Sequence, residues 1–434
     1  MADEVTEPIL REWLDEYEGI YADFMQSLED AGVEFGDRFM HAEENAALKK
    51  RLRDKGALFR NGDASISING ISTACVACTG CAGSQTFYFS LRCHRNCYFC
   101  FNPNQLDYRE HLEHDRDWRG EFRELAREGR AMTHIALTGG EPLLRAHETL
   151  AFFEEAHALW PSAHLRLYTA GDLLDEQVLE DMIARGLCEI RFSIKLEDDK
   201  TVQEGVLDRI RMACEHDVDV MVEMPVMPGT TDEMKQLLEE LDAIGITGIN
   251  LLEFCFPFTD WTEFARRGFK VKNPPFPILY NYEYAGSLPI EGSEEACLEL
   301  LDFALDREFA MGVHYCSLEN KHRDQICQQN HAVPFDDLCY ELDQNDFFWK
   351  TVKTFGASAQ AARIVLSEKA ADGEGRSWRY DTEDECLIVH PDLSALLAGV
   401  PVDLAESANV LEWRDEGVIL RELALTPITA RAEG

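Results

Sequence analysis

The sequence predicts an α/β protein, a partial (β/α)6 barrel with additional segments at both ends. From about residue 84 to residue 320, short apolar segments alternate with segments of helical periodicity. Strands connected by helices run parallel, because each helix crosses the sheet to start the next strand. The expected count is about six strands, fewer than the eight of a closed barrel. Beyond about residue 345 this alternation stops.

The elements of the barrel can be placed from these patterns. The expected strands are at 86–91, 133–137, 165–169, 189–194, 218–224 and 249–254, with 310–315 as a last candidate. The expected helices are at about 111–129, 145–160, 173–186, 198–215, 231–244 and 293–308.

The remaining segments divide the rest of the chain. Residues 1–70 are expected to form a helical N-terminal extension, and residues 71–83 a cysteine-rich loop before the barrel at 84–320. A connecting segment at 321–345 leads to a small α+β C-terminal domain at 346–434. In that domain, strands are expected at 364–366, 385–389, 409–413 and 418–422, with a helical turn at 391–397.

The charge balance is strongly acidic. The 434 residues include 41 Lys and Arg against 81 Asp and Glu, a net charge of -40. Such a surface repels phosphate backbones, so extended nucleic-acid binding is not expected. No apolar run is long enough to span a membrane, and the start lacks the pattern of a secretion signal, so we expect a cytoplasmic protein. Solubility and adaptation to a salty or acid-tolerant host both remain open as reasons for the acidity.

Cysteines are the most informative residues. Of fourteen, six lie between Cys75 and Cys100. In a reducing compartment, closely spaced cysteines indicate metal binding or catalysis rather than disulfides. The crowding therefore favours a metal.

Cys93, Cys97 and Cys100 form a C-x3-C-x2-C loop directly after the first expected barrel strand. Three thiolates can hold three corners of a cubane [4Fe–4S] cluster, which leaves one iron open to a small molecule. Zinc is the alternative, but closed structural zinc sites normally need four ligands. A second motif, with Gly139, Gly140 and Glu141, ends the next expected strand and so lies at the same end of the sheet.

Together, the two motifs make residues 84–320 resemble the radical S-adenosylmethionine (SAM) superfamily. The resemblance implies that SAM chelates the open iron of the cluster through its amino and carboxylate groups. It places Phe99 beside the adenine and gives the Glu141 carboxylate to the ammonium of the SAM methionine. Gly139 and Gly140 would let the backbone approach the ligand closely.

Two further matches are weaker. Ser193 and Lys195, at the end of the fourth expected strand, occupy a place where the superfamily often contacts the SAM ribose or carboxylate. Ordinary strand polarity explains both residues equally well. Near the fifth strand, residues 224–228 replace a Gly-x-Ile-x-Gly pattern that the superfamily often shows. That part of the SAM pocket therefore stays open.

A second cysteine run precedes the barrel. Cys75, Cys78 and Cys81 have the C-x2-C-x2-C spacing that resembles the ligand run of bacterial ferredoxins, and this predicts an auxiliary iron–sulfur cluster. A single zinc or iron, or free thiols, are the alternatives. The candidates for further ligands lie late in the chain and are Cys316, Cys327 and Cys339.

The resemblance implies reductive cleavage of SAM at the cluster to a 5′-deoxyadenosyl radical, which abstracts hydrogen from an unidentified small-molecule or peptide substrate. A flavodoxin or ferredoxin would supply the low-potential electron. No catalytic residue beyond the cofactor site is assigned. The alternative is an iron–sulfur electron-transfer or scaffold protein without SAM cleavage, which would leave Gly139, Gly140 and Glu141 unexplained.

Overall fold

The computed structural model of the chain describes residues 5–79, 83–105, 107–258, 260–275, 287–370, 375, 377–414 and 417–429. Contacts divide them into two compact units. One lies between Val33 and Asp324, and the other combines the residues up to Gly32 with those from Gln325 onward. This division differs from the sequence-based boundaries at 70, 83, 320 and 345.

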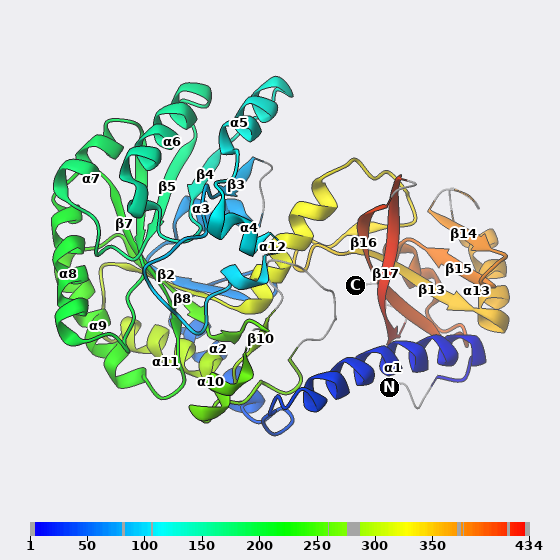
Figure 1. Ribbon diagram of the computed structural model, residues 1–434. Coiled ribbons are helices and arrows are strands. Elements are labelled where there is room, and N and C mark those ends of the chain that lie inside the picture. The colour runs from blue at the N-terminus through cyan, green and yellow to red at the C-terminus, as the bar shows by residue number, and fades with distance from the viewer. Residues whose placement is uncertain are drawn as a thin grey trace. The chain divides into compact units, whose positions relative to one another are not determined.

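The unit between Val33 and Asp324 is built on one sheet (Figure 1). In the described residues it has nine strands in the order β1-β2-β11-β8-β7-β6-β5-β4-β3. The strands from β3 to β8 and β11 are parallel to their neighbours, whereas β2 is antiparallel to β11 and β1 to β2. Their bounds are β1 Leu58–Arg60, β2 Ser65–Ile68, β3 Ser84–Phe87, β4 His134–Leu137, β5 His164–Thr169, β6 Leu187–Phe192, β7 Asp219–Val226, β8 Gly248–Glu253 and β11 Gly312–Cys316.

Helices cover the outer face of this sheet (Figure 1). Polar caps define where several of them begin: Asp117 accepts a hydrogen bond from the Gly120 N–H at 2.9 Å, and Asp175 from the Val178 N–H at 2.8 Å. The helices of this unit are α2 Ala42–Asp54, α3 Thr73–Cys78, α4 Tyr108–Glu113, α5 Trp118–Arg127, α6 Ala146–Leu159, α7 Glu176–Ile183, α8 Lys200–Cys214, α9 Thr231–Ile244, α10 Trp261–Arg266, α11 Ser293–Asp306 and the start of α12 Leu318–His331, with 3-10 turns η2 Asn102–Asn104 and η3 Pro142–Arg145 and a small pair β9 Cys255–Phe256 and β10 Leu288–Pro289.

The two faces of the sheet differ in polarity. In β6, Ile190 and Phe192 are fully buried in the apolar core under the helices. Glu189 and Arg191 alternate with them and bond to each other on the opposite, inner face, where they also meet Ser72. Because side chains of a strand point alternately to its two faces, the polar residues of neighbouring strands gather inside.

The α/β alternation and the parallel sheet confirm the predicted fold class. Each expected barrel strand overlaps an observed strand, and the last candidate, 310–315, is β11, a seventh parallel strand in the described part of the chain. The helical expectation for residues 1–70 missed β1 and β2. These strands have only three and four residues, and β2 is fixed by pairing with β11, where Ser65 lies opposite Cys316.

α3 connects the two edges of this sheet. In the chain it lies between β2, near one edge, and β3, at the other. It contacts β3, and Ser72, which caps its start, bonds to Glu189 and Arg191 on the inner face. The described part of the expected cysteine-rich loop is therefore largely helical, and its start lies on the inner face of the sheet.

The other unit combines an antiparallel sheet with two long helices. Its strands are β12 Glu341–Leu342, β13 Trp349–Phe355, β14 Trp378–Asp381, β15 Cys386–Val389, β16 Leu404–Arg414 and β17 Gly417–Ile428, in the order β14-β15-β13-β16-β17 with β12 beside β13. Helix α13 Gly356–Lys369 and the 3-10 turn η4 Pro391–Leu397 complete it. This confirms the predicted α+β character.

Two expectations about this unit need correction. The strand expected at 364–366 lies in α13, because Ala359, Ala362 and Leu366 repeat at helical spacing and bury one face of that helix. The N-terminal helix α1 Pro8–Asp30 belongs with this sheet, since Leu10 and Leu14 share a core with Phe355.

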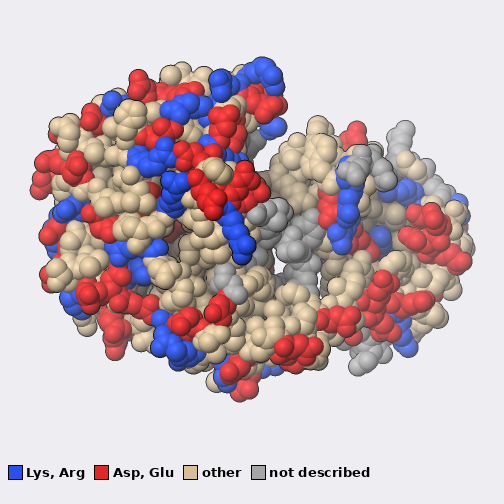
Figure 2. Space-filling model, viewed as in Figure 1, with Lys and Arg blue, Asp and Glu red and all other residues tan. Residues whose placement is uncertain are grey.

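Acidic side chains are spread over the surface and interspersed with basic ones on the face shown in Figure 2. Neighbours of opposite charge form ion pairs, such as Lys235 with Glu299 and Arg211 with Glu240. Within the described ranges, no helix combines the length and the apolar character needed to cross a bilayer.

Phe122 tests the packing of the helical layer. Its fully buried ring lies 5.0 Å from the ring centroids of Phe87 and Phe152, so it links α5 to β3 and α6. We expect Phe122→Ala to reduce the free energy of unfolding by about 3–5 kcal/mol, since the cavity left behind cannot refill. Urea denaturation measures the loss. Leu159→Ala, at a 38% exposed position, should cost much less; equal losses would contradict this packing.

Candidate functional site

A cavity of about 630 Å³ lies at the carboxyl ends of the parallel strands. Every residue predicted for the first cluster and for SAM lines it: Cys93, Cys97, Phe99, Cys100, Gly139, Gly140, Glu141, Ser193 and Lys195. These residues follow three different strands, β3, β4 and β6, and parallel strands bring such loops to one edge of the sheet.

The cysteine loop is held by hydrogen bonds and ion pairs. The Cys100 N–H donates to the Cys97 carbonyl at 3.1 Å, and the Arg95 N–H donates to Cys93 Sγ at 3.3 Å. Arg95 also pairs with Asp198 and, at 3.1 Å, with Asp172. The loop is thus anchored to the segments that follow β5 and β6.

The three thiols suit a shared metal group. Burial raises the pKa of Cys93 and of Cys100; Glu141 and Cys97 add to the shift at Cys93, and the neighbouring cysteines add to it at Cys100. Both thiols therefore ionise more readily once a cation is bound. Among the residues that the structure describes, no three His, Cys, Asp or Glu side chains converge on a single metal ion. A cubane cluster bonds each thiolate to a different iron and so needs wider spacing. Three thiols around one cavity fit that group.

The two glycines allow β4 to approach the start of the cysteine loop. A Cβ on Gly140 would lie 1.8 Å from the Arg92 carbonyl oxygen, and one on Gly139 would lie 2.6 Å from that of Ser90. Gly139 also has a φ of +114°, which favours glycine. The close approach in the structure is therefore to the protein's own backbone, while an approach to SAM stays a prediction.

Glu141 is buried and uses its carboxylate within the protein. Its Oε1 accepts hydrogen bonds from the Leu143 N–H at 3.0 Å and the Thr169 hydroxyl at 2.8 Å, and its Oε2 accepts one from the Ala170 N–H at 2.7 Å. Burial raises the pKa of Glu141, and these hydrogen bonds oppose that shift. The carboxylate thus joins the ends of β4 and β5 to η3. Its contact with the SAM ammonium stays a prediction.

The other predicted SAM residues lie on the walls of the cavity. Lys195 Nζ is 3.9 Å from a carboxylate oxygen of Asp198, and Phe99 meets Phe254 edge-on with ring centroids 5.8 Å apart. Sequence reasoning missed several further lining residues, namely Tyr168, Glu223, Phe254 and Lys321. Inward positions of the strands, read at every second residue, could have indicated Tyr168 and Glu223.

The candidate ligands of the auxiliary cluster are divided between the two units. Cys75 and Cys78 lie on α3, and Cys316 ends β11 in the same unit. Cys327 and Cys339 belong to the other unit, where both are buried. Cys81 lies outside the described residues.

Comparison with known proteins identifies the barrel. Residues 87–241 match the model of the radical SAM superfamily. A protein of Methanocaldococcus jannaschii with the provisional name glycyl-radical enzyme activating enzyme is 24% identical over 58% of this chain and 64% of its own length. The pyruvate formate-lyase 2-activating enzyme of Escherichia coli is 28% identical over 28% of this chain and 43% of its own. The match thus spans less than two thirds of the length of each relative.

Solved structures give weaker matches. SuiB of Streptococcus suis, bound to its precursor peptide SuiA, has 14% identity and a TM-score of 0.39 over 72% of this chain and 64% of its own. The Escherichia coli coproporphyrinogen III oxidase HemN has 14% identity and a TM-score of 0.37, over 55% of this chain and 56% of its own.

Glu141 gives a test of its structural role. Glu141→Ala leaves the Leu143 and Ala170 N–H groups and the Thr169 hydroxyl without their acceptor. Each buried donor that loses its partner costs about 1–3 kcal/mol, so the cofactor-free protein should lose about 2 kcal/mol or more of unfolding free energy. Urea denaturation without iron or SAM measures this loss. Glu141→Gln, which keeps an oxygen acceptor, should lose less; unchanged stability in both variants would contradict the role.

Proposed function

We propose that this chain is a radical SAM enzyme that cleaves SAM reductively to start radical chemistry on a substrate, since residues 87–241 match the model of that superfamily. The cavity at the carboxyl edge of the sheet carries this proposal. It brings the three cysteines and Phe99 of one loop together with the predicted SAM residues of two other segments. Chance does not account for so many separate predictions meeting in one cavity.

In this proposal Cys93, Cys97 and Cys100 hold a [4Fe–4S] cluster, with SAM beside it. When bound, the cluster supplies the electron that divides SAM into methionine and a 5′-deoxyadenosyl radical, which takes hydrogen from the substrate. The protein binds and orients the reactants and excludes water from them.

Individual side chains have distinct tasks in this arrangement. Phe99 and Phe254 form an aromatic wall that offers stacking and edge contacts to a purine ring. Lys195 and Lys321 line the same cavity and supply positive charge for the carboxylate of SAM or for an anionic substrate. The hydrogen-bonded Glu141 keeps the loops after β4 and β5 in register.

The relatives favour a protein substrate among the small-molecule and peptide options. One carries the name of an enzyme that activates glycyl-radical enzymes, and the other the name of an enzyme that activates pyruvate formate-lyase 2. We therefore infer hydrogen abstraction from a polypeptide segment that enters the cavity. A flavodoxin or ferredoxin would supply the electron, and a reducing cytoplasm would keep the cysteine thiols free. An auxiliary iron–sulfur cluster, expected from the cysteines of residues 75–81, completes the proposed cofactor set.

The test is anaerobic reconstitution of the full chain, followed by dithionite and SAM. We expect 5′-deoxyadenosine and methionine in equal amounts, measured by liquid chromatography. Cys97→Ala should abolish 5′-deoxyadenosine formation, because one corner of the cluster loses its thiolate.

Cys214→Ala provides the matched control, since Cys214 is a half-buried cysteine at the end of α8 and does not line the cavity. It should retain wild-type formation of 5′-deoxyadenosine. If the wild-type chain forms no more 5′-deoxyadenosine than Cys97→Ala does, SAM cleavage is rejected. If SAM then also failed to bind the reconstituted protein, the alternative of an electron-transfer or scaffold protein would replace it.

A further inference from the structure

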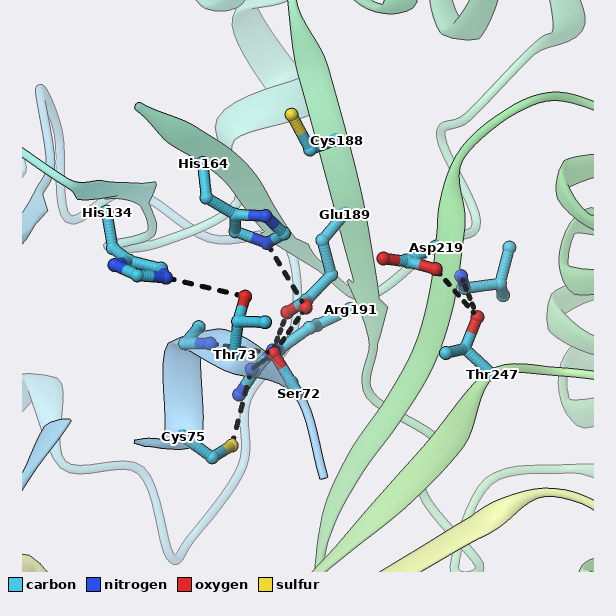
Figure 3. Close-up of polar contacts among 12 residues, drawn as sticks. Ser72, Thr73, Cys75, His134, His164, Cys188, Glu189, Arg191, Asp219 and Thr247 are labelled. Carbon is cyan, nitrogen blue, oxygen red and sulfur yellow. Dashed lines mark hydrogen bonds and ion pairs between the residues drawn. The ribbon is translucent and has the colours of Figure 1, made fainter. Parts of the chain in front are cut away.

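The inner face of the sheet holds two of the α3 cysteines in a polar setting. Cys75 and Cys78 are three residues apart and so share one face of α3. Figure 3 shows Cys75 pointing toward Arg191 of β6. Its Sγ accepts hydrogen bonds from Arg191 Nη2 at 3.5 Å and Asn250 Nδ2 at 3.4 Å.

Cys316 reaches the same place from β11. It stands two residues after His314, whose ring bonds on the inner face to Asn250 at 3.0 Å and Ser65 at 2.8 Å. Strand alternation therefore directs Cys316 inward as well. Its Sγ accepts a hydrogen bond from Asn320 Nδ2 at 3.3 Å.

A hydrogen-bond chain connects Cys316 to the end of α3. The side-chain amide of Asn61 donates from Nδ2 to Asn320 Oδ1 at 2.8 Å and to the Thr79 hydroxyl at 3.1 Å. Thr79 follows Cys78 in the chain. Cys78 also lies within electrostatic range of both Cys75 and Cys316. The three cysteines thus form one group, although they come from residues far apart in the chain.

Arg166 of β5 supplies an independent observation. Its side chain is 3% exposed, and its Nε and Nη1 have no hydrogen-bond acceptor among the described residues. The guanidinium lies within electrostatic range of Cys78. A buried cation without an acceptor is costly, so its surroundings call for an anion.

The nearby carboxylates already have other partners. Glu189 bonds to Arg191, Ser72 and His164, as Figure 3 shows, and Glu223 bonds to Arg191 at 2.6 Å and Asn250 at 2.7 Å. Cys78 is the remaining group beside Arg166 that becomes anionic when it binds metal.

We propose that Cys75, Cys78 and Cys316 ligate a second iron–sulfur cluster inside the curved sheet, with Arg166 as its counter-charge. Each thiol gives its proton to solvent and forms one S–Fe bond. This deepens the proposed function by naming the ligands of the auxiliary cluster, and it selects Cys316 from the three late cysteines. Its test does not require SAM cleavage.

The location also defines what this cluster can do. Glu223 lines the SAM cavity and, on its other side, meets Arg191 and Asn250, which contact Cys75. The described lining of the cavity includes Glu223 but none of the three cysteines. The second cluster therefore lies behind the cavity wall, where it exchanges electrons with the first site rather than anchoring a substrate.

The experiment removes the ligands of the first cluster and measures the iron and sulfide that the chain still binds. The full chain carrying Cys93→Ala, Cys97→Ala and Cys100→Ala is reconstituted anaerobically with ferric iron, sulfide and dithiothreitol. Iron, acid-labile sulfide and zinc are then measured per chain, with Mössbauer spectra. We expect about four iron and four sulfide, the content of one [4Fe–4S] cluster.

Adding Cys316→Ala to that protein should reduce both values to below about one quarter of this content. Adding Cys327→Ala or Cys339→Ala instead should leave them unchanged, because these cysteines belong to the other unit. Absence of iron and sulfide from the starting protein, zinc without sulfide, or full content after Cys316→Ala would each overturn the proposal.

Circular dichroism and gel filtration show whether the Cys316→Ala protein folds. If it does not fold, Cys316→Ser takes its place in the test. Cys316→Ser preserves the size of the side chain and replaces the sulfur with oxygen. We expect a changed Mössbauer isomer shift at one iron site, and an unchanged spectrum would reject Cys316 as a ligand. SAM cleavage is absent from these proteins, so failure here is distinct from failure of the proposed function.

Arg166 has a separate readout. Removing a positive charge beside a cluster disfavours the added electron, so Arg166→Met should lower the midpoint potential of the second cluster. Arg166→Lys should keep it close to the wild-type value. The measurement is a redox titration followed by electron paramagnetic resonance in the protein without the first cluster. Equal potentials in all three proteins would reject Arg166 as the counter-charge.

Discussion

The backbone of Gly140 passes so close to the Arg92 carbonyl that no side chain fits between them, and the geometry of the site depends on this contact. It joins the end of β4 to the segment that leads into Cys93. The Glu141 N–H then donates to the same carbonyl at 2.8 Å, and the Glu141 carboxylate extends the connection to Ala170 after β5. Three loops are thus positioned by bonds within the protein. Such preorganisation lets a cofactor bind without paying the entropy of ordering each loop.

The inner face of the sheet obeys a second constraint, that of charge balance. Although burial opposes it, the Arg191 guanidinium lowers the pKa of Glu189, and it also pairs with Glu223. Buried ion pairs gain little stability over apolar packing, but removing one partner is severely destabilising. Arg166 stands beside this balanced network without an acceptor among the described residues. The principle that accounts for the paired charges also applies to Arg166, and it indicates that an anionic group binds beside this side chain.

Local patterns were sufficient to predict much of this molecule. Alternation of apolar strands and amphipathic helices gave the parallel sheet, and spacing gave the cysteine loop with Cys93, Cys97 and Cys100. Features fixed by distant contacts were out of reach. Short β2 exists because it pairs with β11, and α1 packs on a sheet from the far end of the chain. For the same reason spacing alone could not choose among Cys316, Cys327 and Cys339. Nor did the sequence indicate that the Glu141 carboxylate is occupied by protein donors.

The pairing of β2 with β11 can form only late in synthesis, after β11 has left the ribosome. Ser65 and His314, which bond across this pair, are separated by 249 residues. At ribosomal rates, roughly 12–50 s pass between their emergence. During that interval the hairpin of β1 and β2 has no sheet to join, and the cysteines of α3 have no finished surroundings. Stray metal ions and oxidants can reach them before the sheet closes. The nascent chain, rather than the folded protein, is therefore the stage at which these thiols most need protection.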